Sequence, residues 1–77
     1  MVRFFARLRE EFGTGEKVLK LRDGATLAEL LDLVLKDRRP KDLIIAVNNE
    51  LIGDRPVEDL RLEDGDTVDI MPPASGG

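Results

Sequence analysis

Residues 2–9 alternate between apolar and polar side chains. Four apolar residues fall on one face of an extended segment: Val2, Phe4, Ala6 and Leu8. Arginines occupy most of the other face, with Phe5 as the apolar exception. This period of two predicts a half-buried strand. The glycine-containing stretch 12–15 predicts a turn and residues 16–22 predict a second strand, so we expect the chain to open with a hairpin.

A helical pattern follows. Thr26 and Glu29 have the spacing of a capping box, in which each side chain bonds the other residue's amide. Apolar residues then recur at intervals of three and four: Leu27, Leu30, Leu31, Val34 and Leu35. This stripe predicts an amphipathic helix of about three turns. We expect the helix to stop before Pro40, because proline cannot continue it.

The second half of the chain predicts three more strands. Residues 43–47 are all apolar, which is typical of a strand buried on both faces. Asn48 and Asn49 predict a turn, after which Leu51 and Ile52 could form a short strand. Residues 56–62 resemble a loop with one helical turn. A turn at residues 64–66 leads into the last strand, residues 67–71.

This order of elements predicts an α+β fold. We expect a β-grasp, ubiquitin-like roll, in which a mixed sheet of four to five strands packs on one helix. The crossover through the helix allows the first and last strands to pair in parallel at the centre of the sheet. The domain would cover residues 1–71, and residues 72–77 would form a flexible tail.

The residue set restricts the chemistry of the chain. His and Cys are both absent from the 77 residues, so the commonest proton-transfer group and the strongest nucleophile are missing. We therefore expect no catalysis by this chain alone, no disulfide and no bound cofactor. The acidic segment 63–66 lacks the D-x-D-x-D-G order of a calcium loop, so we expect an ordinary turn there and no metal site.

Charge and hydropathy exclude two classes of partner. A net charge of −4 and the absence of Tyr and Trp disfavour nucleic acid. The basic cluster from Lys36 to Lys41 is expected at a helix C-terminus, where cations are favoured. No apolar run approaches the roughly 20 residues of a membrane span. The N-terminus does not resemble a signal peptide, so we expect a cytoplasmic location.

The last six residues have a different character, Pro72-Pro73-Ala74-Ser75-Gly76-Gly77. The prolines stiffen the base of this tail, whereas the glycines leave its tip thin and flexible. Extended, it would reach roughly 20 Å beyond the last strand. Such a tip suits a narrow active-site tunnel in another protein. A frayed terminus is the alternative interpretation of the glycine pair alone.

Three segments resemble the small subunit of molybdopterin synthase, a family of ubiquitin-like sulfur carriers. They are VRFFARLREEFG at the start, AVNNELI in the middle and LEDGDTVDIMPPASGG at the end. Ala74 stands where the family more often has Val, and the terminal glycines are unchanged.

The resemblance implies a function for the tail. A ubiquitin-activating-type enzyme would use ATP to adenylate Gly77, and a sulfur donor would convert it to a thiocarboxylate. Gly76 would be the slender segment behind it. The large synthase subunit, with which the chain would form a heterotetramer, would receive the tail and transfer the sulfur to a pterin precursor. Carriers for thiamine or tRNA thiolation, and ubiquitin-like protein modifiers, share this fold and stay open as alternatives.

Partner binding requires exposed apolar surface, and we expect it on the sheet face away from the helix. The candidates on the strands are Phe5, Ile45, Val47 and Met71. Those in the tail are Pro72, Pro73 and Ser75.

Overall fold

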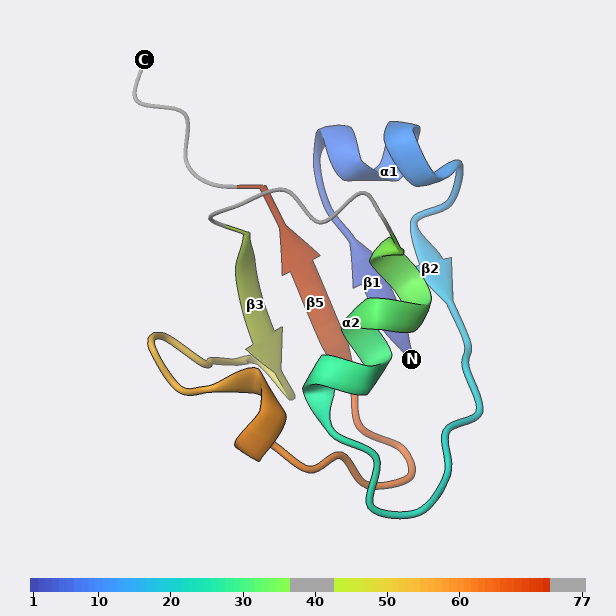
Figure 1. The fold of residues 1–77 in the computed structure, drawn as a ribbon. Coiled ribbons are helices and arrows are strands. Elements are labelled where there is room, and N and C mark those ends of the chain that lie inside the picture. Colours follow the sequence, from blue (N-terminus) through green and yellow to red (C-terminus); the bar gives the residue numbers. More distant parts are fainter. Residues whose placement is uncertain (37–42, 73–77) are drawn as a thin grey trace.

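A five-stranded sheet forms the centre of the molecule (Figure 1), in a computed structural model that describes residues 1–36 and 43–72. The strands are β1 (Val2–Phe4), β2 (Glu16–Lys17), β3 (Ile44–Val47), β4 (Glu50–Leu51) and β5 (Val68–Met71). Their order in the sheet is β2-β1-β5-β3-β4. β1 and β5 run parallel, whereas the other neighbours are antiparallel. The predicted parallel pairing of the first and last strands is therefore confirmed.

The main helix, α2 (Leu27–Leu35), lies across one face of this sheet (Figure 1). The Thr26 hydroxyl accepts a hydrogen bond of 3.3 Å from the Glu29 amide, as the capping box predicts. The sequence predicted that the Glu29 carboxylate would reach back to the amide of Thr26. In the structure it accepts a hydrogen bond from the Arg22 guanidinium instead. All five residues of the predicted stripe are buried. The helix ends at Leu35, and Pro40 lies outside the described residues.

A second helix, α1 (Arg7–Phe12), replaces the last three residues of the predicted first strand, so that prediction is correct only for residues 2–4. β1 stops at Phe4, and the chain then turns at Ala6 with a φ of 53°. Leu8 and Phe12 have a spacing of four, so both reach the core from one side of a helix. The Phe12 ring stacks on Phe4 with 4.8 Å between centroids. Over so few residues, the same apolar positions fit both the alternation of a strand and one face of a short helix, so the sequence pattern does not separate the two.

Two other predictions need correction. β2 covers only residues 16–17 of the expected 16–22. Residues 18–25 belong to none of the five strands. β3 is not buried on both faces, because Ile44 is 36% exposed. The turn at Asn48 and Asn49 is confirmed, since both residues have a positive φ. A 3₁₀ turn at η1 (Val57–Asp59) matches the predicted helical turn.

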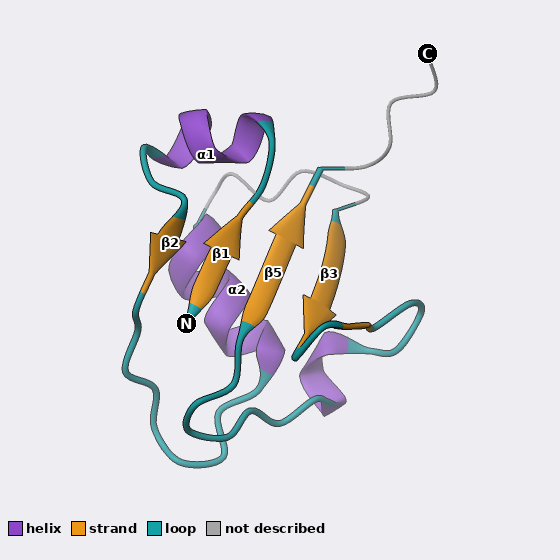
Figure 2. Cartoon of the chain, turned by 180° about the vertical axis from the view of Figure 1, so that it is seen from behind, coloured by secondary structure: helices purple, strands orange, loops and turns teal. Residues whose placement is uncertain are grey.

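The core lies between α2 and one face of the sheet. The strands contribute Val2, Phe4, Ile45, Val68 and Ile70 to it. Seen from behind, the opposite face of the sheet is not covered by any described helix (Figure 2). Within residues 1–36 and 43–72, no helix is both long and apolar enough to cross a membrane.

Candidate functional site

The sheet face away from α2, here called the outer face, is defined by the strand register. Ile44 pairs with Met71, and Ala46 pairs with both Asp69 and Leu51. Residues directly opposite one another share a face of the sheet. The outer face therefore carries these residues together with Arg3, which pairs with Asp69 from β1. Ile44 and Leu51 are exposed, at 36% and 62%, so this face offers apolar surface to a partner.

Phe5 adds to the same face, although it follows the last residue of β1. Its amide donates a hydrogen bond of 3.2 Å to the carbonyl of Ile70, which continues the β1–β5 pairing. Its side chain is 38% exposed. The Arg3 guanidinium lies 5.7 Å from the centroid of the Phe5 ring, within the range of a cation–π contact.

Two of the predicted partner-binding residues lie on the wrong face. Ile45 is only 8% exposed and belongs to the core, and Val47 packs against the same core. They pair with Ile70 and Val68, whose side chains are buried beneath α2. Because side chains alternate along a strand, the residues that reach the outer face from β3 are Ile44 and Ala46.

The remaining predicted residues lie at or beyond the end of β5. Met71 is the last residue of that strand, is half-buried and pairs with Ile44 on the outer face. Pro72 follows it and is also half-buried. Pro73, Ser75, Gly76 and Gly77 lie outside the described residues. The tail thus leaves from the strand that carries Met71, beside Phe5.

An ion pair occupies the middle of the outer face. Arg3 donates from Nε to Oδ1 of Asp69 at 2.6 Å and from Nη2 to Oδ2 at 2.8 Å. Such a bidentate pair is stronger and more directional than a single contact. The hydrogen bond to Asp69 raises the pKa of Arg3, desolvation opposes it, and the charges of Asp69 and Glu16 add to the increase. Sequence reasoning missed this pair; its signal was a lone carboxylate within the apolar strand 68–71.

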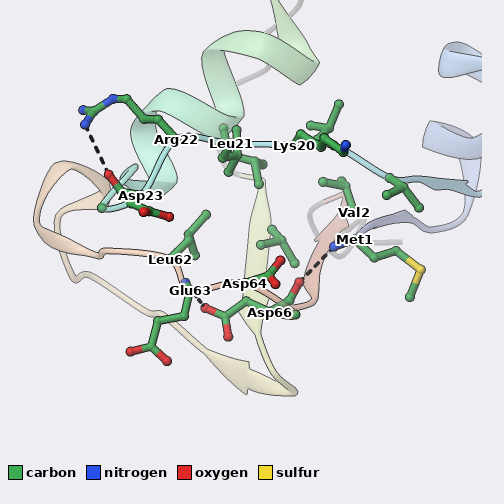
Figure 3. A pocket seen from close by; sticks show the side chains of 16 residues that line it. Met1, Val2, Lys20, Leu21, Arg22, Asp23, Leu62, Glu63, Asp64 and Asp66 are labelled. Carbon is green, nitrogen blue, oxygen red and sulfur yellow. Dashed lines mark hydrogen bonds between the residues drawn. The ribbon is translucent and has the colours of Figure 1, made fainter.

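A groove of about 710 Å³ lies between the segment 18–24 and the turn at 62–66 (Figure 3). The turn is held by Asp66, whose carboxylate accepts from the Glu63 amide at 2.8 Å and from the Asn48 side chain at 2.9 Å. The segment predicted to be an ordinary turn has that structure. Among the described residues, no group of three acidic side chains is arranged to hold a metal ion.

Comparisons with known proteins agree with this fold. Residues 2–77 match the model of the ThiS family. The molybdopterin synthase sulfur carrier subunit of Chlamydomonas reinhardtii is 38% identical over 81 residues, which cover 99% of this chain and 95% of that protein.

Two solved structures have the same architecture. One, described as a molybdopterin converting factor, subunit 1, from Pyrococcus furiosus, is similar with a TM-score of 0.75 and 30% identity, covering 94% of this chain and 93% of that one. SAMP1 from Haloferax volcanii gives a TM-score of 0.80 at 22% identity, covering 99% and 96% of the two chains. The second likeness concerns the fold alone. The predicted β-grasp fold is confirmed.

Proposed function

Because the chain belongs to the ThiS family, we propose that it is the sulfur-carrying small subunit of a molybdopterin synthase. The observation that carries this proposal is the 38% identity to a molybdopterin synthase sulfur carrier subunit over nearly the full length of both chains. The order of elements along the chain supports the proposal, since the tail that would bear the sulfur follows directly after β5.

The proposed reaction begins at the carboxylate of Gly77. One carboxylate oxygen attacks the α-phosphate of ATP, and pyrophosphate leaves. Hydrosulfide released by the sulfur donor then attacks the carbonyl carbon of the acyl adenylate, and AMP leaves with that oxygen. The product is a thiocarboxylate. Adenylation is needed because a free carboxylate is anionic and has no good leaving group. The activating enzyme would bind the ATP, so the cycle would run in the cytoplasm, where ATP is available.

The large synthase subunit is the proposed acceptor of the loaded tail. This chain has no His or Cys, so the groups that transfer sulfur to the pterin precursor would come from the larger partner. Phe5 and Met71 lie where the tail leaves the sheet, and docking of the outer face there would align the tail with the partner's active site. We expect two copies of each subunit in the complex.

Intact mass spectrometry tests the proposal. The chain is incubated with ATP, a sulfur donor and the adenylating enzyme from the same organism, and its mass should rise by the difference between sulfur and oxygen. A chain lacking Gly77 is the matched control and should gain nothing while melting at the same temperature. No mass gain by the complete chain, or an equal gain by the deletion, would contradict the proposal. Lysine-linked Gly-Gly remnants on other proteins would instead identify a protein modifier.

A further inference from the structure

The ion pair of Arg3 and Asp69 is unusual for its position. Asp69 is the one buried charged residue among those that the structure describes, with 6% exposure, yet it faces away from the core. Its neighbours on that face are apolar: Ala46, Ile44 and Met71. The Arg3 side chain covers the carboxylate and is itself 34% exposed. A partner that docks on the outer face must therefore dock on this guanidinium.

The hydrogen bonds of Arg3 leave one side of its planar group unused. Nε and Nη2 both bind Asp69, and Nη2 also donates to Oδ1 of Asn49 at 3.4 Å. Within residues 1–36 and 43–72, no acceptor takes the hydrogens of Nη1. Because the guanidinium is rigid and held on its other side, these two donors have a fixed direction.

Docking would remove Nη1 from water. A buried donor without an acceptor is costly, so a partner that fits must place an oxygen over it. The local charge indicates which kind of oxygen. Asp69 and Glu16 already lie beside Arg3, since Glu16 is its register partner on β2. A carboxylate from the partner would add a third negative group around one positive group, whereas a neutral carbonyl would not.

From this arrangement we infer that Arg3 is a specificity-determining residue of the outer face, and that it recognises a neutral carbonyl oxygen on the large subunit. The inference rests on the proposed function, which supplies the large subunit as the occupant. Phe5, Met71 and Ile44 would supply apolar area, which discriminates little between partners. The fixed donors of Arg3 would reject a partner that leaves them unpaired.

Two double variants, titrated with the purified large subunit, test the role of Arg3. Arg3→Asp with Asp69→Arg keeps an ion pair between the two strands but moves the guanidinium to β5. Arg3→Met with Asp69→Leu replaces the pair by apolar side chains, a change that folded proteins often tolerate. The matched control is Arg22→Met with Glu29→Leu, which removes an ion pair beside α2. Thermal melts accompany each titration.

Both outer-face variants should bind about tenfold to a hundredfold more weakly than the unchanged chain, a loss typical of a hydrogen bond to a charged group. The control should bind normally. If the swapped pair or the apolar pair binds as tightly as the unchanged chain, the inference is wrong and the pair only stabilises the sheet. If the unchanged chain itself does not bind the large subunit, the proposed function fails, which is a different result. A variant that does not fold is replaced by Arg3→Lys, which keeps the charge without the planar fork and should also bind more weakly.

Discussion

Phe5 donates its amide hydrogen to the carbonyl of Ile70 across the two parallel strands, while its ring lies on the opposite face from the buried Ile70 side chain. The backbone of Phe5 thus belongs to the sheet, whereas its side chain is 38% exposed. Removing the ring should therefore leave the strand pairing intact and remove apolar surface from the outer face.

We expect Phe5→Ala to weaken binding of the large subunit by about 2 kcal/mol, or roughly thirtyfold, because aromatic anchors dominate many interfaces. The melting temperature should change little. Leu33→Ala is the matched control, since Leu33 is 55% exposed and lies on α2, on the opposite side of the sheet from the outer face. Titrations and melts of both variants decide the matter. Normal binding by Phe5→Ala would place the interface elsewhere, and loss of folding would make Phe5 a core residue.

Leu31→Ala should be strongly destabilising. Leu31 lies in the middle of α2 and is only 2% exposed. Truncating a buried leucine typically costs about 2–5 kcal/mol, a large part of the stability of a small domain. Leu33→Ala on the same helix is the control, because Leu33 is 55% exposed and should lose far less. Urea unfolding measures both, and equal losses would refute the assignment of the buried face.

The elements that could be predicted from the sequence are those with a complete pattern. The stripe and cap of α2 extend over residues 26–35, long enough to separate a helical period from alternation. The asparagine turn could be predicted because Asn accepts a positive φ, which both residues adopt. α1 could not, because its packing depends on a contact between Phe12 and Phe4 that only the folded chain provides.

The candidate site was predictable in part. Phe5 stood out as an apolar residue on a polar face, and the structure leaves it exposed. Ile44 and Ile45 could not be told apart, because an entirely apolar strand has no alternation to indicate which side is buried. The register with β5 decides it, since Ile45 pairs with the buried Ile70 and Ile44 with Met71. That register depends on contacts between residues far apart in the chain.

Ala6→Gly should stabilise the protein. Ala6 has φ 53° and ψ −134°, a backbone conformation that suits glycine and strains a residue with a Cβ. Relief of this strain should exceed the extra chain entropy of glycine, for a net gain of about 1 kcal/mol. Ala28→Gly in α2 is the matched control and should lose about 1 kcal/mol, because that position is helical. Denaturant unfolding gives both signs, and a loss for both variants would contradict the argument.

Acid should weaken the turn that Asp66 holds. The amide of the Asn48 side chain, followed by the backbone N–H of Glu63, lowers the pKa of Asp66, because both donate to its ionised carboxylate. A pKa that is lower in the folded state than in the unfolded chain means that the charged form stabilises folding. This stabilisation is present above the unfolded value of about 4 and is lost as the pH falls through the folded value.

Asp66→Asn should therefore be less stable than the unchanged chain at pH 7, by at most about 1 kcal/mol because the group is partly exposed. The difference should shrink as the pH falls below about 4, since protonation removes the same charge that the substitution removes. Asp64→Asn, which changes the net charge equally at a neighbouring exposed residue, corrects for the overall charge. Urea unfolding at pH 7 and at pH 3 measures the two gaps. A gap for Asp66→Asn that stays constant or widens in acid would show that the ionised carboxylate does not stabilise the turn.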